Sequence, residues 1–234
     1  MAPFFKSSLI CLFLIPNIKS KIPIVFFCLN LRNIEETLNF KHRNLNTEGT
    51  RRDEIINTAT ELFKDKGYSA VTMRDLATAM GMKAASLYNH INSKQEILKA
   101  IIISLAEEFT QGMDAIKKLD QTAIEKLKLI VALHVDITTK NPHGMASLNN
   151  DWMHLEGQLD YYLGLRERYE QDFVEIIRDG ISSNEIVDTN PEVVMFSILS
   201  TLRSLYLWIP KKEEINAKAL AQNLSEVLIN GINK

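Results

Sequence analysis

The stretch TMRDLATAMGMKAASLYNHI, residues 72–91, decides the fold of this chain. It begins with Thr72 and an acid three residues later, which is a common start signal for a helix. Gly81 then suits the left-handed turn that ends a helix, and a second short helix fills the remainder. Two helices joined by a tight turn that contains glycine predict a helix-turn-helix.

The second helix of this pair has few apolar residues, so most of it is expected on the surface. Met82 and Leu87 can pack against the first helix, where Ala77 permits a close approach. A short exposed helix of this kind can enter the major groove of DNA. The outward residues are Lys83, Ala84, Ser86, Asn89 and His90, together with the amphipathic Tyr88, whose hydroxyl can reach a phosphate.

Charge does not choose between DNA binding and a helical hairpin that merely packs. Residues 48–98 hold seven basic and seven acidic side chains, and the 234-residue chain has a formal charge of −2. The placement of the charges is therefore more informative than their total. Arg51, Arg52, Lys83 and Lys94 lie at expected helix starts, where backbone N–H groups also favour phosphates.

Helix start and stop signals continue to the end of the chain, with little strand pattern. Thr50, Ser93 and Thr122 each precede an acid by three residues, and Asn190-Pro191 combines a cap with a first-turn proline. We expect helices that start at 50, 72, 93 and 122, and others over about 159–182, 191–208 and 215–230. The predicted fold class is all-α, with a three-helix DNA-binding domain at 49–109, its helix-turn-helix at 72–91, and a larger helical domain at 110–234.

Residues 1–46 form an atypical N-terminal extension. They contain the apolar runs LICLFLI (9–15) and IPIVFFCL (22–29), each shorter than a membrane span. The only two cysteines, Cys11 and Cys28, also lie here, which excludes a zinc finger or a disulfide framework elsewhere. Three interpretations remain open: a signal or anchor, a disordered leader, or an extension that is not native to the functional protein.

The helix-turn-helix and its flanks resemble the N-terminal domain of the tetracycline-repressor (TetR) family of bacterial transcriptional regulators. The resemblance covers IINTATELFKDKGYSAVTMRDLATAMGMKAASLYNHINSKQEIL, residues 55–98. Two departures are Ile91, where an aromatic residue is usual, and Lys83-Ala84-Ala85, where a small polar residue and Gly are common. The matching positions are Ala59, Phe63, Gly67, Tyr68, Thr72, Leu76, Ala77, Gly81, Leu87, Tyr88, His90, Ser93 and Lys94.

This resemblance implies a role in DNA binding for individual positions. Phosphates would be held by Thr72, Tyr88, His90 and Lys94, with Arg51 and Ser86 on the same face. Bases or the groove would be faced by Lys83, Ala84, Ala85 and Asn89. Since phosphate contacts position a protein and base contacts specify the site, we expect residues 83–85 to set the operator preference.

The larger domain has no catalytic pattern, so we predict neither an enzyme nor a cofactor or metal. His134, His143 and His154 are scattered, and no nucleophile–base pair or phosphate loop occurs. Methionine and aromatic side chains favour a pocket for an apolar ligand, with plain core packing as the alternative, above all for His134. The candidate pocket residues are Met113, His134, Met145, Trp152, Met153, Arg166, Tyr169, Phe173, Met195 and Arg203.

Residues 150–208 resemble a C-terminal subtype found in regulators of fatty-acid, acyl-CoA or sterol breakdown. The signature consists of Trp152-x-x-Leu155, the group Arg166, Tyr169 and Glu170, and the late Trp208. The resemblance implies an acyl-CoA effector, whose phosphates would meet Arg166, Arg203 or Lys211.

Two helices near the C-terminus are more apolar than a single core contact requires. Two such helices from each of two chains would form a four-helix interface, and a two-fold dimer predicts a palindromic operator. The predicted interface residues are Val194, Ile198, Leu202, Leu205, Ile209, Leu220, Leu224 and Val227.

The sequence therefore indicates a cytoplasmic, ligand-responsive regulator, of a family whose members are usually repressors. Its expected partners are double-stranded operator DNA, a second copy of itself and a small effector such as an acyl-CoA, with no membrane. A membrane-associated or secreted helical protein is the alternative, and its support is confined to the first 30 residues.

Overall fold

The computed structural model describes residues 50–230 and Ile232, and these fold into helices with no strand element among them. The predicted all-α class is confirmed. Short 3-10 turns are η1 (Tyr68–Ala70), η2 (Trp152–His154) and η3 (Ile209–Lys211). The α-helices are α2 (Arg51–Lys66), α3 (Met73–Ala79), α4 (Ala84–Tyr88), α5 (Lys94–Lys117), α6 (Ala123–Lys140), α7 (Pro142–Asn150), α8 (Leu159–Ser182), α9 (Pro191–Arg203), α10 (Leu205–Trp208) and α11 (Ala217–Ile229).

The three interpretations of the N-terminal extension concern residues 1–46, which lie outside the described part of the chain. They stay open, and so does the alternative that depends on the apolar runs there.

Threonine capping boxes start three of the helices. Thr50, Thr72 and Thr122 each accept a hydrogen bond from the N–H three residues on, and the acid there bonds back to the threonine N–H. Ser93 accepts from the Glu96 N–H at 3.1 Å, but the Glu96 carboxylate bonds instead to the N–H of Asn92 and to Arg52. The Ser93–Glu96 spacing is typical of a complete capping box, but only half of it forms, because Glu96 ties the start of α5 to α2.

Helix α7 was not expected, although its start signal stands in the sequence. The Asn141 side chain accepts from the Gly144 N–H at 2.8 Å, and Pro142 follows as the first helical residue. This is the same signal as Asn190-Pro191, which begins α9. The single helix expected over 191–208 is interrupted at Ser204, so that α9 and α10 are separate.

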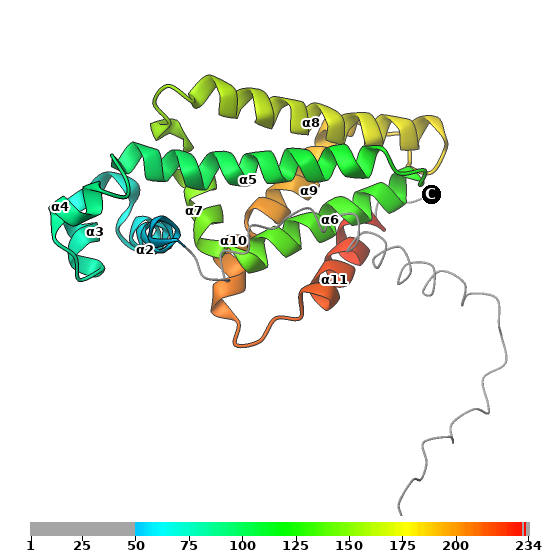
Figure 1. The fold of residues 1–234 in the computed structure, drawn as a ribbon. Coiled ribbons are helices and arrows are strands. Elements are labelled where there is room, and N and C mark those ends of the chain that lie inside the picture. The colour runs from blue at the N-terminus through cyan, green and yellow to red at the C-terminus, as the bar shows by residue number, and fades with distance from the viewer. Residues whose placement is uncertain (1–49, 231, 233–234) are drawn as a thin grey trace, which may run out of the picture. The chain divides into compact units, whose positions relative to one another are not determined.

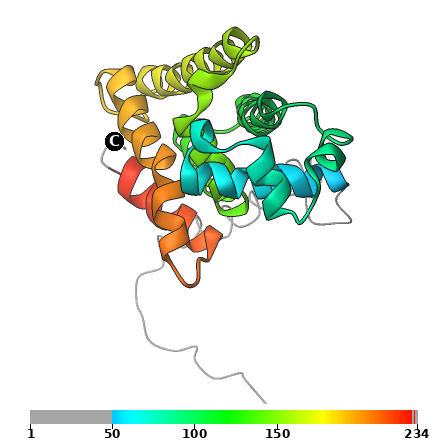
Figure 2. The same cartoon turned by 90° about the vertical axis from the view of Figure 1, so that its left-hand side faces the viewer.

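One long helix, α5, runs from the helix-turn-helix region into the larger helical domain. The small helices α2, α3 and α4 gather at its N-terminal end, as Figure 1 shows and as Figure 2 shows from that side. Farther along, α5 packs against α6, α7 and α8, and α11 packs against α6. Because α5 runs through the boundary proposed at 109/110, the two domains share a helix; the boundaries themselves stay a prediction.

The far end of α5 is fixed to α8 by ion pairs. Lys117 Nζ donates to Asp172 Oδ1 at 2.5 Å and to Glu175 Oε2 at 2.7 Å. These hydrogen bonds, that of Asp172 first, raise the pKa of the Lys117 ammonium. Arg168 Nη2 adds a contact of 2.6 Å to Asp114 Oδ1. These partly exposed pairs orient α8 against α5 more than they stabilise it.

Two glycines of α8 give a matched test of how tightly this helix is packed. A Cβ built at Gly180 would lie 2.6 Å from Ile186 Cδ1 and 2.7 Å from Ala123 Cβ, whereas one at Gly164 meets nothing within 4 Å. Gly180→Ala should therefore lower the free energy of unfolding by about 1–3 kcal/mol. Gly164→Ala should raise it by about 0.5–1 kcal/mol, because alanine favours a helix interior. Urea unfolding measures both, and a neutral or stabilising Gly180→Ala would contradict the packing.

Candidate DNA-binding surface and effector pocket

Helices α3 and α4 form the helix-turn-helix that residues 72–91 predict. The turn between them is closed by the Met82 N–H, which donates to the Ala77 carbonyl at 2.8 Å, and Gly81 takes the left-handed conformation with φ of 63°. Leu87 and Ile91 are buried beneath α4. The departure from the family at Ile91 therefore changes packing and not a surface contact.

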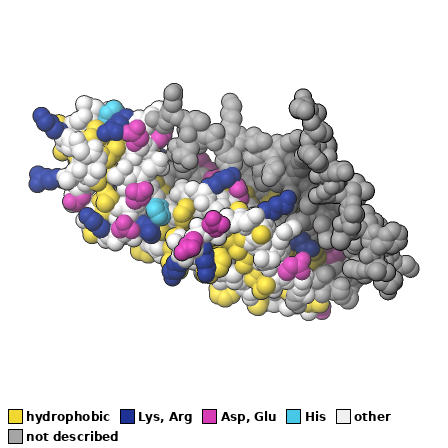
Figure 3. All heavy atoms as spheres, turned by 90° about the horizontal axis from the view of Figure 1, so that it is seen from below, with side chains coloured by type: hydrophobic (Ala, Val, Ile, Leu, Met, Phe, Trp, Pro, Cys, Tyr) yellow, Lys and Arg dark blue, Asp and Glu magenta, His cyan; other side chains and the backbone are white. Residues whose placement is uncertain are grey.

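The outward face of α4 is open to solvent. Tyr88 is 50 % exposed, and the Lys83 side chain makes no cap hydrogen bond. Lys and Arg side chains stand at this end of the molecule in Figure 3. The phosphate and base contacts stay predictions, on a face where Lys83, Ala84, Ala85, Ser86, Asn89 and His90 are all exposed.

Three of the predicted phosphate-binding residues already have partners within the protein. Lys94 Nζ donates to the carbonyls of Tyr68 at 2.8 Å and Val71 at 2.9 Å, so at least two of its three N–H groups point inward. The Thr72 hydroxyl donates to Asp75 Oδ2 at 2.6 Å, and Arg51 pairs with Glu54. The phosphate contact of Lys94 stays a prediction, and the structure adds a supporting role, because its ammonium holds η1 in place.

Tyr68 joins this domain to the larger one. The His154 ring stacks on the Tyr68 ring with centroids 5.2 Å apart, and Lys94 Nζ lies 4.2 Å from the centroid of the same ring. Gln95 Nε2 donates to the His154 carbonyl at 2.8 Å. Burial, followed by the charges of Glu156 and Asp151, raises the pKa of Tyr68. Sequence reasoning missed this contact because the residues are about 60–85 positions apart.

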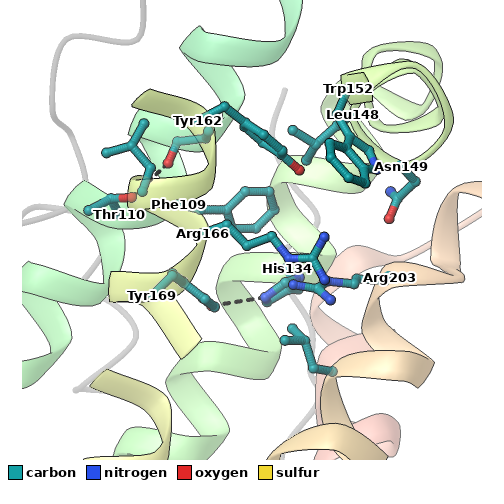
Figure 4. Close-up of a pocket in the computed structure, with 13 residues that line it drawn as sticks. Phe109, Thr110, His134, Leu148, Asn149, Trp152, Tyr162, Arg166, Tyr169 and Arg203 are labelled. Atoms are coloured by element: carbon teal, nitrogen blue, oxygen red, sulfur yellow. Dashed lines mark hydrogen bonds between the residues drawn. The ribbon is translucent and has the colours of Figure 1, made fainter. Parts of the chain in front are cut away.

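A cavity of about 90 Å³ opens between α5, α6, α7, α8 and α9. Figure 4 shows aromatic rings and two guanidinium groups converging on it. Its walls are Ala106, Phe109, Thr110, His134, Leu148, Asn149, Trp152, Tyr162, Leu165, Arg166, Tyr169, Leu199 and Arg203.

The cavity brings together only part of the predicted pocket. His134, Trp152, Arg166, Tyr169 and Arg203 line it. The other predicted members do not: Met113, Met145 and Phe173 are buried in the surrounding core, Met153 is 59 % exposed, and Met195 is half-buried on α9.

Helical spacing could have found several of the missed wall residues. On α8, Tyr162, Leu165, Arg166 and Tyr169 follow the spacing i, i+3, i+4 and i+7, which places them on one face. On α5, Ala106, Phe109 and Thr110 repeat the first part of this pattern.

One carboxylate holds both cationic side chains of the cavity. Arg166 Nε donates to Glu170 Oε1 at 3.0 Å, and Arg203 Nη2 donates to the same oxygen at 2.7 Å. Burial acts to raise the pKa of Glu170, but the hydrogen bonds from Arg203 and Arg166 outweigh it and hold the pKa below its usual value. Two positive charges therefore face one negative charge, which favours a ligand with an anionic part.

A buried histidine and tyrosine form the innermost polar contact. His134 Nε2 and the Tyr169 hydroxyl are 2.9 Å apart, and the Phe109 ring covers the imidazole with centroids 4.5 Å apart. Burial, with a smaller effect from the Arg203 charge, lowers the pKa of His134 to about 3, so the ring is neutral at pH 7. Burial likewise raises the pKa of Tyr169. His134 Nδ1 is buried without a hydrogen-bond partner.

Two features of residues 50–230 bear on the other classes of protein. Among these residues, no group of three or more His, Cys, Asp or Glu side chains gathers where a metal could bind. The stretch Pro191–Lys211 is long and apolar enough to cross a membrane by length and composition alone, with 33 % of it buried. Such a stretch is weak evidence for a membrane span, since a core helix meets the same criteria.

Two family models match the chain. Residues 55–101 match the bacterial regulatory proteins of the tetR family, and residues 120–232 match the tetracyclin repressor-like C-terminal domain. The first match contains α3 and α4, and the second contains most of the cavity walls.

Full-length relatives point in the same direction. The chain is 21 % identical over 186 residues to the HTH-type transcriptional repressor KstR2 of Mycolicibacterium smegmatis, which covers 78 % of this chain and 91 % of that protein. It is 23 % identical over 186 residues to the fatty acid metabolism regulator protein of Bacillus subtilis, with 76 % and 94 % covered. The solved structure of AibR in complex with isovaleryl coenzyme A and operator DNA shares the fold, with a TM-score of 0.65, 21 % identity, and 76 % and 97 % covered.

Two lysines of the small domain allow the role of Lys94 to be tested. Lys94→Met removes a charged donor from the carbonyls of Tyr68 and Val71, so the free energy of unfolding should fall by about 1.5–3 kcal/mol. Lys83→Met, at the exposed start of α4, should stay within about 0.5 kcal/mol of the parent protein. Chemical denaturation followed by circular dichroism compares them, and equal stability of both variants would refute the supporting role.

Proposed function

The chain belongs to the TetR family of bacterial transcriptional regulators, and we propose that it is a repressor that binds a palindromic operator as a homodimer and leaves it when an acyl-CoA or similar apolar effector binds. One observation carries this proposal. The segment 148–154 lines the cavity through Leu148, Asn149 and Trp152 and contacts the DNA-binding domain through His154. A ligand in the cavity therefore touches the same short segment that holds the helix-turn-helix domain.

DNA binding is assigned to the exposed face of α4. The residues at its start, Lys83-Ala84-Ala85, would face base edges, and Tyr88 would hold a phosphate. Lys94 would contribute by fixing η1, whose Tyr68 carbonyl accepts from its ammonium, and by meeting a phosphate at the start of α5. A balanced total charge is compatible with this assignment, because groove contacts need only a local basic face.

The dimer interface is assigned to residues other than the stripe that the sequence favoured. Val194, Ile198, Leu202, Leu205 and Ile209 are buried within a single chain, so this part of the prediction was wrong. The opposite face of α9 and α10 carries the exposed Val193, Phe196, Leu207 and Trp208. Ser197, Ser200, Thr201 and Ser204 lie between them, and such small residues permit close helix approach.

Helix α11 extends this apolar surface. Val227 is 77 % exposed, while Leu220 and Leu224 are half-buried. Figure 3 looks onto the face with α10 and α11 and shows hydrophobic side chains along it. Exposed apolar patches of this kind mark protein interfaces, and a second copy of the chain is the partner that we propose. The same interface would cover the apolar stretch Pro191–Lys211 without a membrane.

The effector is proposed to be an acyl-CoA because of the charge and size of the cavity. A volume of about 90 Å³ has space for roughly six to nine water-sized groups, which suits an acyl group but not a whole coenzyme A. Arg166 and Arg203 line the cavity and are still about one-third exposed. They are placed to meet the anionic part of a ligand whose remainder lies outside. Such a regulator would act in the cytoplasm, where the operator is.

Two substitutions in α4 separate positioning from base recognition. Tyr88→Phe should weaken binding to all operators alike, by about 2- to 10-fold, since it removes one hydroxyl hydrogen bond. Lys83→Ala should instead change the order of preference among operators with single base changes, because a base contact is worth about 1–3 kcal/mol of discrimination. Anisotropy titrations at fixed salt measure both. An unchanged order with Lys83→Ala, or unchanged affinity with Tyr88→Phe, would contradict the assignment.

The proposed dimer face can be tested with two aspartate substitutions. Phe196→Asp puts a charge at a side chain that is 69 % exposed on α9, so the protein should sediment as a monomer at micromolar concentration. Leu163→Asp, at a side chain 38 % exposed on α8, should leave the dimer intact. A parent protein that is already monomeric, or a dimer that survives Phe196→Asp, would rule out this interface.

A further inference from the structure

The His134–Tyr169 pair has one hydrogen-bonding group left over inside the cavity wall. His134 is 3 % exposed and lines the cavity, and its Nε2 is 2.9 Å from the Tyr169 hydroxyl. Its other ring nitrogen, Nδ1, is buried and has no partner among the described residues. A buried polar atom without a partner is uncommon in a folded protein and needs an explanation.

The proton of the His134 imidazole can be placed by comparing the hydrogen bonds of its two tautomers. Burial keeps the ring neutral, so only one of its nitrogens carries hydrogen. If Nε2 donated to Tyr169, the hydroxyl hydrogen and the Nδ1 lone pair would both lack partners, because Tyr169 makes no other hydrogen bond in residues 50–230. If Tyr169 donates to Nε2, only the Nδ1–H remains. The second arrangement leaves fewer unsatisfied groups, so Nδ1 is a donor that lacks an acceptor.

The neighbouring wall residues do not supply that acceptor. Arg203, which acts on His134 through its charge and lies beside it in Figure 4, carries donors only. The Thr110 hydroxyl donates to the Ala106 carbonyl and Glu170 is held by Arg166 and Arg203, and neither oxygen-bearing side chain makes a hydrogen bond with Nδ1. The remaining surface near the imidazole includes the Phe109 ring. No described residue supplies an acceptor for Nδ1–H, and a ligand in the cavity could bring one.

We propose that His134 recognises the acyl carbonyl of the effector: its Nδ1–H donates to the carbonyl oxygen, while Tyr169 fixes the tautomer from the other side. This inference rests on the proposed effector pocket, and it identifies the ligand atom that the pocket recognises. The carbonyl of a thioester and the carboxylate of a free acid share this chemistry. In either case the acyl chain lies among the apolar walls and the charged part of the ligand meets Arg166 and Arg203.

Recognition of this kind makes the pocket selective. A ligand of the same shape without the carbonyl would leave Nδ1–H unpaired in a water-poor site. Sites built to bond a polar atom reject analogues that lack it far more strongly than apolar sites reject a missing methylene. His134 is then a specificity-determining residue, in contrast to the core role that its apolar helix stripe alone suggests.

The test compares three ligands that differ at one atom or group. A series of saturated acyl-CoAs is titrated by calorimetry, and the chain length that binds most tightly is compared with its S-alkyl thioether of coenzyme A and with the free acid. The parent protein should bind the thioester about 10-fold or more tightly than the thioether. His134→Phe, which keeps the ring shape, should reduce this ratio to about one. A free acid that binds as tightly as the thioester, with the same loss in His134→Phe, would also support the carbonyl contact and identify the acid as its source.

The failures are distinguishable. Equal binding of thioester and thioether by the parent protein overturns the role of His134 and leaves the proposed effector class intact. No binding of any acyl-CoA or acid overturns both. If His134→Phe does not fold, the comparison on the parent protein decides alone. An infrared spectrum of the ¹³C-labelled thioester carbonyl adds a direct readout: its band should move to lower frequency on binding, and an unshifted band would contradict the hydrogen bond.

Discussion

The Tyr68 ring, which lies against both Lys94 and His154, is the contact on which the proposed coupling of the two domains depends. Lys94 lies over the Tyr68 ring and bonds the carbonyls of Tyr68 and Val71, and His154 stacks on the same ring. A helix that contacts DNA phosphates can be positioned accurately only if the segment that supports it is itself fixed. The same ammonium that the sequence assigned to DNA therefore secures the domain that presents α4.

In the proposed mechanism the segment 148–154 makes this contact responsive to a ligand, because some of its residues line the cavity and His154 contacts Tyr68. Leu148, Asn149 and Trp152 belong to the cavity, and His154 belongs to the junction with Tyr68. In the proposed mechanism, a ligand that prefers one position of Trp152 also biases His154, since only one residue separates them in the chain. Linkage then requires that DNA binding alter the affinity for the effector by the same factor. The proposed function therefore implies one equilibrium that both the ligand in the larger domain and the DNA at α4 shift.

The sequence predicted local features better than it predicted which side of a helix is buried. Thr50, Thr72 and Thr122 form the expected caps because a capping box needs only neighbouring residues. The helix-turn-helix follows for the same reason, with Gly81 at its turn. On α9 both faces are apolar, so periodicity alone could not decide between Val194 inside and Phe196 outside. Contacts such as Gln95 with His154 depend on the tertiary fold and carry no local signal.

The polar side chains around the cavity of the larger domain are not explained by their contribution to folding. Arg166, Glu170 and Arg203 form partly exposed ion pairs, and such pairs contribute little to stability. The buried His134 leaves one nitrogen unpaired, which is a cost. All four residues nevertheless meet at or beside one cavity with apolar walls, where a ligand with an anionic part and a carbonyl would satisfy them. A group of residues that adds little to stability, and that a single kind of ligand would satisfy, is better explained by binding than by folding.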